Sequence, residues 1–192
     1  FAGCEDRLDI AKHGNMGGQD DFYKTNEQTE QAVAAMYGRV KGLYFTWFFT
    51  KNMLSDDAWC GGGSRGDNNS YEQLNEFTFD SSNGNVEGLF SGLYGIIYQS
   101  NLIIEKVADD TDVKKRAIAE AYFFRAWANF ELVTLWGTAP LVDHLLATGE
   151  YRQPNSTPEA LWAVVESDLK EAIGMNALPS KKNKDDQETG MR

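Results

Sequence analysis

Apolar side chains recur at steps of three and four residues over 27–53, the spacing that places them on one face of a helix. Thr25 and Asn26 precede this run, and both residue types commonly cap a helix N-terminus. The pattern predicts a long first helix. Its expected inward positions are Val33, Met36, Tyr37, Val40, Tyr44, Trp47 and Phe48.

A second helix is predicted over 86–108 by a similar apolar side. Gly88, Gly92 and Gly95 form a separate strip along it. Glycine inside a helix lowers its stability, so a strip of glycines favours the close approach of a neighbouring helix. A membrane dimer contact is disfavoured, because charged residues follow within the same segment. The apolar positions of this helix are Leu89, Phe90, Leu93, Ile96, Ile97, Ile104 and Val107.

The segment 112–136 has apolar residues around nearly its whole circumference, which indicates a helix buried on more than one side. Gly137 and Pro140 provide its stop signal. We expect Phe124, Trp127 and Phe130 to be largely inaccessible. A charge among so many aromatic rings needs a partner, so Arg125, Asn129 and Glu120 should meet polar groups.

A fourth helix is predicted to start at Pro158, capped by Thr157, and to end near Gly174. Its expected inward residues are Leu161, Trp162, Val165, Leu169 and Ile173. The four helices predict an all-α fold of tetratricopeptide-like helical hairpins, with a long irregular loop between the first two helices.

That loop, residues 55–82, carries the candidate ligand-binding residues Asp57, Trp59, Arg65 and Asn68 in a glycine-rich span. An aromatic ring with carboxylate, amide and guanidinium groups beside it is the set of side chains that sugars require. The alternative is a solvated loop whose Trp59 and Tyr71 pack down onto the helices.

Charge and composition narrow the function further. The formal net charge is -11, which disfavours nucleic acid as a partner, since phosphate binding depends on clustered lysine and arginine. His13 and His144 lack a second ligand at metal-binding spacing, and the glycine-rich "CGGGSRG" lacks the ending of a phosphate-binding loop. We therefore expect no metal and no cofactor. Adjacent carboxylates such as Asp56 and Asp57 rarely face one substrate, so we expect no enzyme activity.

The two ends suggest a division of the chain. Phe1-Ala2-Gly3 before Cys4 is similar to the end of a bacterial lipoprotein signal, which predicts lipid on Cys4; the alternative is an ordinary thiol or a bridge to Cys60. Residues 1–25 are then a lipoprotein N-terminus and tether, and 26–180 are the helical domain. Residues 181–192 are expected to be a polar loop leading to a further C-terminal part.

The segment 117–142 reads "AIAEAYFFRAWANFELVTLWGTAPLV" and carries a specific resemblance. Its Ala-Glu-Ala at 119–121, Phe-Arg-Ala at 124–126 and Gly-x-x-Pro-Leu-Val at 137–142 resemble the SusD/RagB family, the surface glycan-binding lipoproteins of Bacteroidetes nutrient uptake. The sequences around Asn101, at 21–40 and at 152–179 are similar to this family as well.

The resemblance implies a non-catalytic protein at the outer-membrane surface. It also implies an oligosaccharide or polysaccharide ligand, a SusC-like TonB-dependent transporter as partner, and attachment to the membrane through a lipid anchor only. Family members continue into a C-terminal half that is expected to carry part of the glycan site. A peptide ligand, a helical-repeat module that binds another protein, and a fragment of a glycoside hydrolase remain as alternatives.

Overall fold

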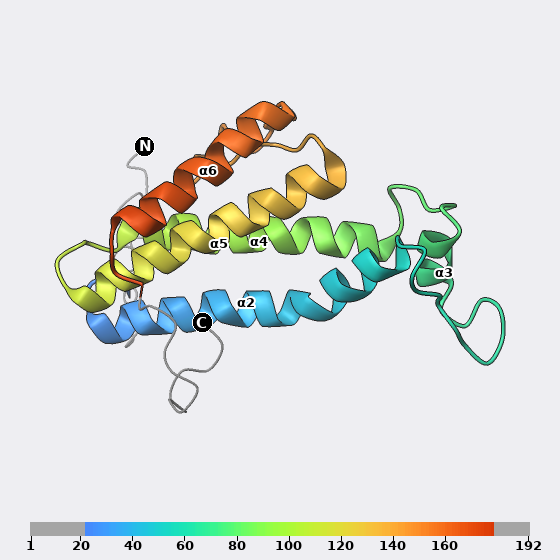
Figure 1. Cartoon of the computed structure of the whole chain (residues 1–192). Coiled ribbons are helices and arrows are strands. Elements are labelled where there is room, and N and C mark those ends of the chain that lie inside the picture. Colours follow the sequence, from blue (N-terminus) through green and yellow to red (C-terminus); the bar gives the residue numbers. More distant parts are fainter. Residues whose placement is uncertain (1–21, 179–192) are drawn as a thin grey trace, which may run out of the picture.

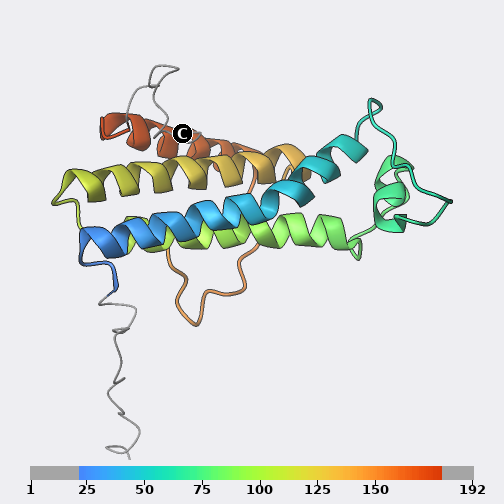
Figure 2. The same ribbon diagram turned by 90° about the horizontal axis from the view of Figure 1, so that it is seen from below.

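The computed structural model describes residues 22–178, and within this range the chain is helical with no strand (Figure 1). The helices are α2 (Asn26–Met53), α3 (Asn69–Asn75), α4 (Gly84–Lys106), α5 (Asp112–Trp136) and α6 (Pro158–Gly174). Helix α2 packs against α4 and α5, and α6 packs on α5. Helix α3 lies beyond the ends of α2 and α4 (Figures 1 and 2). The all-α prediction is confirmed.

Local capping sets the helix ends. Thr25 Oγ1 accepts from the N–H of Gln28 at 3.2 Å, and Gln28 Oε1 accepts from the N–H of Thr25 at 3.1 Å. Thr111 and Thr157 cap α5 and α6 in the same way, each accepting from an N–H three residues on. Gly137, at φ 73°, ends α5 in a conformation that favours glycine. The predicted helix bounds are therefore confirmed to within two residues.

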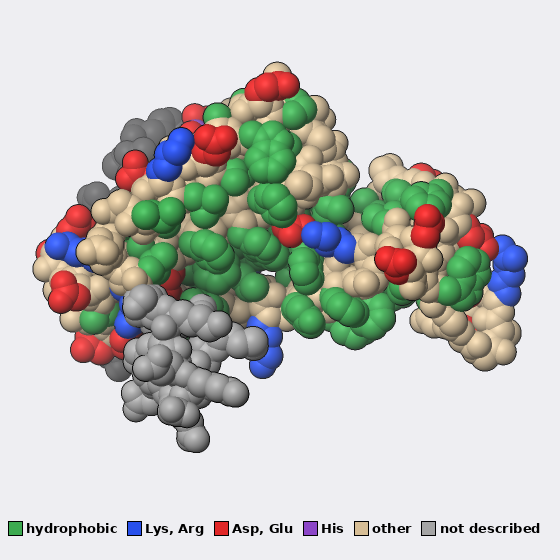
Figure 3. All heavy atoms as spheres, viewed as in Figure 1, with side chains coloured by type: hydrophobic (Ala, Val, Ile, Leu, Met, Phe, Trp, Pro, Cys, Tyr) green, Lys and Arg blue, Asp and Glu red, His purple; other side chains and the backbone are tan. Residues whose placement is uncertain are grey.

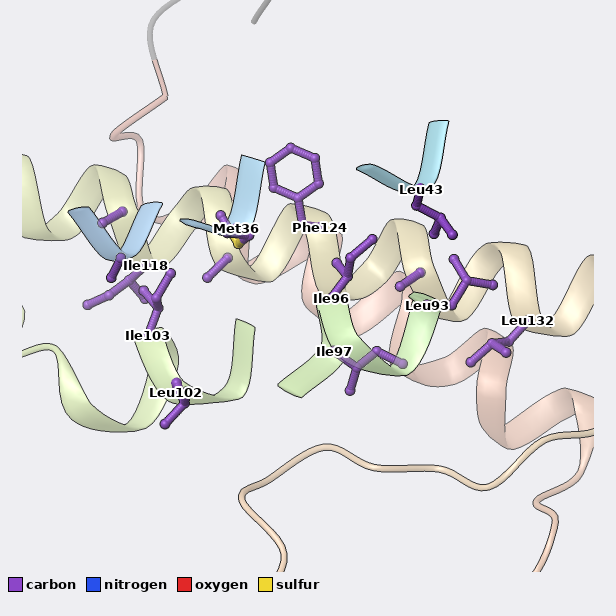
Figure 4. Close-up of a cluster of buried hydrophobic side chains, with 14 of the residues drawn as sticks. Met36, Leu43, Leu93, Ile96, Ile97, Leu102, Ile103, Ile118, Phe124 and Leu132 are labelled. Carbon is purple, nitrogen blue, oxygen red and sulfur yellow. The ribbon is translucent and has the colours of Figure 1, made fainter. Parts of the chain in front are cut away.

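The core lies between α2, α4 and α5, and its side chains come from all three helices (Figure 4). Burial of one such aliphatic side chain contributes roughly 1.5 to 3 kcal/mol. The labelled members are Met36 and Leu43 of α2, Leu93, Ile96, Ile97, Leu102 and Ile103 of α4, and Ile118, Phe124 and Leu132 of α5.

The glycine strip of α4 faces α2. A Cβ placed on Gly92 would overlap the Leu43 side chain, and one on Gly95 would lie 3.1 Å from Arg39 Nη1. Gly92 thus lets Leu43 reach the core between the two helices. The prediction that the glycines serve a packing contact between helices is confirmed.

The predicted burial of several large side chains is wrong. Phe124 is buried and Trp127 half-buried, but Phe130 is 38% exposed. In α2, Leu43 is buried while Tyr44 and Phe48 are exposed, and in α6, Trp162, Leu169 and Ile173 are exposed. The cause is the arrangement of the neighbours: α4 covers one side of α5 and α6 another, whereas α2 covers a third side only in part and leaves Phe123 and Phe130 exposed.

We call this open surface the aromatic face. Its members on α5 are spaced four and three residues apart, so they share one side of the helix. Ring contacts join the helices: Trp47 lies 6.2 Å from Trp127, and Phe130 lies 5.7 Å from Trp162. Figure 3 shows hydrophobic side chains gathered over α2, α5 and α6. The aromatic face comprises Tyr44, Trp47, Phe48, Phe123, Trp127, Phe130 and Trp162.

On another side of α5, a buried polar cluster joins three helices and one loop. Arg125 donates from Nε to Asp168 Oδ2 at 2.8 Å and from Nη2 to Asp168 Oδ1 at 2.7 Å. Its Nη1 donates to Asn101 Oδ1 at 2.7 Å and to the backbone oxygen of Asp143 at 2.6 Å. Burial opposes the charge of Arg125, but Asp168 outweighs this effect and the pKa of Arg125 is raised. The expected polar partner of Arg125 is confirmed.

Replacing Arg125 by methionine should lower the free energy of unfolding by roughly 3 to 5 kcal/mol, because Asp168 would stay buried without its partner. Lys170→Met is the control, since Lys170 and Glu166 form an exposed pair at 3.3 Å that should be worth about 0.5 kcal/mol or less. Urea denaturation of both variants measures the difference. Equal losses in the two variants would show that the buried cluster does not hold α6 on α5.

Candidate functional site

The segment between α2 and α4 is more regular than the predicted irregular loop, because it contains the helix α3. Two asparagines hold α3 in place. Asn75 Nδ2 donates to the backbone oxygens of Met53 and Ala58 at 2.7 and 2.9 Å, and Asn75 Oδ1 accepts from the N–H of Cys60 at 2.6 Å. Asn83 caps α4 with its Oδ1 and donates from Nδ2 to the backbone oxygen of Ser70 at 2.9 Å. The loop is thereby tied to both long helices.

Side chains also shape the turn before α3. Asp67 accepts from the N–H and the hydroxyl of Ser64, both at 2.8 Å, and these bonds lower the pKa of Asp67. The N–H of Gly66 donates to both carboxylate oxygens of Glu72 at 2.9 Å. Gly66 has φ 91°, which a side chain would strain. The glycines of this loop thus permit a tight turn.

This turn encloses a pocket of about 320 Å³, which we call the loop pocket. Two of the predicted ligand residues, Trp59 and Arg65, line it. Asn68 donates to the backbone oxygen of Gly61 at 3.4 Å and so braces the pocket wall. Asp57 is exposed and lies outside the lining. The full lining is Trp59, Cys60, Gly61, Gly62, Ser64, Arg65, Glu72 and Glu76.

The two aromatic residues of this segment take different positions. Trp59 is 71% exposed, so its ring is open to solvent at the pocket. Tyr71 is half-buried, with its ring 5.8 Å from that of Phe49 in α2. The alternative of an aromatic anchor on the helices therefore describes Tyr71 and not Trp59.

The loop pocket offers the polar groups that hydroxyl-rich molecules need. Arg65 forms an ion pair with Glu76 at 2.5 Å, and the Arg65 side chain is 81% exposed, so its remaining donors face solvent. The carboxylates of Glu72 and Glu76 add acceptors. A ring stacked on Trp59 would have donors and acceptors within the same pocket.

A second pocket, of about 380 Å³, was missed by the sequence analysis. It lies between α4 and the segment that connects α5 to α6, which projects beyond α4 (Figure 2). The signal was the spacing of Tyr94, Tyr98 and Asn101, which places them on one side of a helix. We call this the tyrosine pocket. Its lining is Tyr94, Tyr98, Asn101, Val142, His144, Leu145, Leu146 and Tyr151.

Hydrogen bonds fix the segment that walls the tyrosine pocket. Asn101 Nδ2 donates to the backbone oxygen of His144 at 2.9 Å, and the Tyr94 hydroxyl donates to that of Pro140 at 2.6 Å. Glu105 Oε1 accepts from the N–H of Leu145 at 2.5 Å. Burial raises the pKa of Tyr94. Three side chains of α4 thus position the facing backbone.

At the edge of the tyrosine pocket, His144 lies between two carboxylates. Its Nδ1 is 2.8 Å from Asp143 Oδ1, and its Nε2 is 3.4 Å from Glu150 Oε2. The hydrogen bond to Asp143, and then that to Glu150, raises the pKa of His144. These contacts favour the charged form of the imidazole.

Some expectations concern residues outside 22–178. Cys4 and His13 both lie outside this range, so the predicted lipid on Cys4 and its alternative bridge to Cys60 both involve a residue that the structure does not describe. Within the described residues, no group of three histidine, cysteine or carboxylate side chains is arranged to hold a metal ion. The helices of the same range include none that is both long and apolar enough to span a bilayer.

Comparison with known proteins identifies the fold and family. The SusD-like family described as "Starch-binding associating with outer membrane" matches residues 19–189. A SusD-like protein of Bacteroides ovatus is 29% identical over 185 residues, covering 90% of this chain and 32% of that protein. SusD-like protein P38 of Formosa agariphila is 26% identical over 171 residues, covering 88% of this chain and 33% of that protein.

A solved structure titled "Laminarin binding SusD-like protein" is 29% identical in sequence and superposes with a TM-score of 0.70. The match covers 80% of this chain and 34% of that structure. The present chain thus spans about a third of the length of the relatives it matches. Since the family match extends over most of the chain and the helical architecture agrees with it, the chain belongs to the SusD-like family.

Proposed function

We propose that this chain is the N-terminal part of a non-catalytic glycan-binding protein of the bacterial outer-membrane surface. The support is its family, described as starch-binding and associated with the outer membrane, and the similarity to a laminarin-binding relative. Glycan is bound intact and passed to a SusC-like TonB-dependent transporter. The carboxylates of the loop pocket accept hydrogen bonds from sugar hydroxyls in this proposal.

One observation carries the proposal of a site in the loop pocket: a solvent-exposed tryptophan at a pocket lined by charged groups. An exposed indole gains when an apolar sugar face covers it, and the neighbouring guanidinium and carboxylates bond to the hydroxyls. Trp59 is the stacking surface and Arg65 a hydrogen-bond donor. Asn68 acts through the wall it braces, and Asp57 contributes from outside the lining.

Trp59→Ala should weaken glycan binding by about 1 kcal/mol, or roughly fivefold in Kd, because it removes one aromatic contact. The thermal midpoint should hardly change, since the ring is 71% exposed. A glycan array that includes starch and laminarin selects the probe, and calorimetry then compares the variants.

Trp162→Ala is the matched control, because it removes an exposed tryptophan of α6 that lies outside the loop pocket. Its affinity for the same glycan should equal that of the unaltered chain. Unchanged affinity in Trp59→Ala would place the site elsewhere, and a collapse of the thermal midpoint would make Trp59 a structural residue.

The proposal includes a lipid anchor on Cys4, with residues 1–25 as tether. Two acyl chains would hold the protein at a bilayer surface, each buried methylene contributing about 0.8 kcal/mol. Mass spectrometry of the protein from its native membranes should find Cys4 acylated. An unmodified Cys4, or one bridged to Cys60, would contradict the anchor.

We further propose that residues 26–180 form one domain of a longer polypeptide, whose remainder covers the aromatic face. The relatives are about three times as long as the region matched, and so large an exposed aromatic surface is typical of an interface. The rival function, a helical-repeat module that binds another protein, is favoured by the same surface. The two differ in whether the covering protein is part of the same polypeptide.

Phe130→Asp distinguishes them when it is made both in residues 1–192 and in the longest polypeptide that the gene encodes. In residues 1–192 the urea midpoint should fall only modestly, because the ring is 38% exposed. In the longer polypeptide the loss in free energy of unfolding should be larger by a few kcal/mol, since the charge would be buried there. Ser91→Asp, at an exposed position of α4, is the control. Equal losses in the two polypeptides would favour the module that binds a separate protein.

A further inference from the structure

The tyrosine pocket combines open aromatic rings with a firmly held wall. Tyr98 is 47% exposed and Tyr151 is 69% exposed, so two of its three tyrosines present ring surface to solvent. They come from different elements, α4 and the segment that connects α5 to α6. Its volume, about 380 Å³, is within the range of small-molecule sites.

The wall of this pocket is anchored in the buried core. Asn101 is 1% exposed, and it accepts from Arg125 Nη1 while it donates to the backbone oxygens of Val142 and His144. Arg125 in turn bonds to the backbone oxygen of Asp143. The segment opposite Tyr98 is thus fixed by side chains that solvent does not reach. A ligand would meet a pocket that is already formed, which limits the entropy lost on binding.

The chemistry of the lining favours a ring with one apolar face and hydroxyl edges. Tyrosine rings offer stacking surface, Val142, Leu145 and Leu146 add apolar area, and tyrosine hydroxyls can donate or accept. Sugars have both properties.

Charge selects among sugars. Asp143 and Glu150 flank His144, and Glu105 reaches the neighbouring backbone N–H of Leu145. These three carboxylates outnumber the one histidine beside them, and the whole chain has a formal net charge of -11. This balance disfavours anionic sugars.

We propose that the tyrosine pocket is a second sugar-binding subsite, which takes neutral sugar units through Tyr98 and Tyr151. It rests on the proposed glycan-binding function and adds a site that is separate from the loop pocket. Tyr98 is 14 positions after the first residue of α4, or about 21 Å along the helix axis, whereas the loop pocket lies around α3 beyond that end. A short oligosaccharide therefore fills each pocket independently.

The test uses the 192-residue chain with isotope-labelled tyrosine and a panel of short neutral oligosaccharides derived from starch and laminarin. Binding should shift the ring signals of Tyr98 and Tyr151 in NMR spectra. The double variant Tyr98→Ala/Tyr151→Ala should lose about fivefold or more in affinity at one of two sites, while the Trp59-dependent site keeps its affinity. Trp59→Ala should give the converse result.

Two controls keep a folding defect apart from a binding defect. Tyr98→Phe retains the ring and should keep most of the affinity. Tyr44→Ala removes a tyrosine of the aromatic face whose exposure, 59%, lies between those of Tyr98 and Tyr151, and it should not affect binding. The thermal midpoint of every variant is compared with that of the unaltered chain.

Each outcome separates this inference from the proposed function. The second subsite alone would be overturned by two results together: oligosaccharide binds the unaltered chain without shifting the Tyr98 and Tyr151 signals, and the double variant binds as many oligosaccharides as the unaltered chain. Loss of all binding in the double variant, with Trp59→Ala unaffected, would support the tyrosine pocket and overturn the loop pocket. Absence of binding to every member of the panel by the unaltered chain would overturn the proposed function and this inference together.

Discussion

The buried guanidinium of Arg125 is the constraint on which the arrangement of α4, α5, α6 and their connecting segment depends. A charge in the interior must be paired and fully hydrogen-bonded, and the planar guanidinium donates its hydrogen bonds in a fixed set of directions. Asp168 takes two of its N–H groups, which sets the rotation of α6 on α5. Asn101 and the backbone of Asp143 take the third nitrogen, which fixes the register between α4 and the segment after α5. A shift of α6 would leave two buried charges unpaired, and a shift of α4 or of the connecting segment would remove an acceptor from Nη1.

The two sides of α5 are therefore held by different kinds of contact. Its polar side is specified by directional bonds and tolerates little displacement. Its aromatic side contacts α2 through large rings such as Trp47 and Trp127, which lack that directional requirement. Between them, Gly92 lets α2 approach α4 closely enough for Leu43 to enter the core. The glycines thus allow α2 and α4 to pack closely, and the Arg125 cluster fixes the orientation of α4, α5 and α6.

Local features of the fold could be predicted from the sequence, and features that depend on distant neighbours could not. Thr25, Thr157 and Gly137 determine helix ends through contacts within a few residues, so their roles can be read from sequence. Asp168, 43 residues from Arg125, is one carboxylate among many until the fold brings the two together. Helix α3 is short and its asparagine contacts reach other elements, which its own periodicity cannot reveal. The exposure of Phe130 could not be predicted, because the sequence shows that the ring is apolar but does not show which neighbour covers it.

The same distinction separates the two pockets. The loop pocket was accessible to sequence reasoning because Trp59 and Arg65 lie six residues apart, and the bonds that shape its turn join exposed neighbours such as Ser64 and Asp67. Bonds of this kind compete with water and stabilise a loop only weakly. The tyrosine pocket is assembled from α4 and residues more than 40 positions later, held by hydrogen bonds from the buried side chain of Asn101. Partial burial strengthens these bonds, which fixes the backbone that walls this pocket.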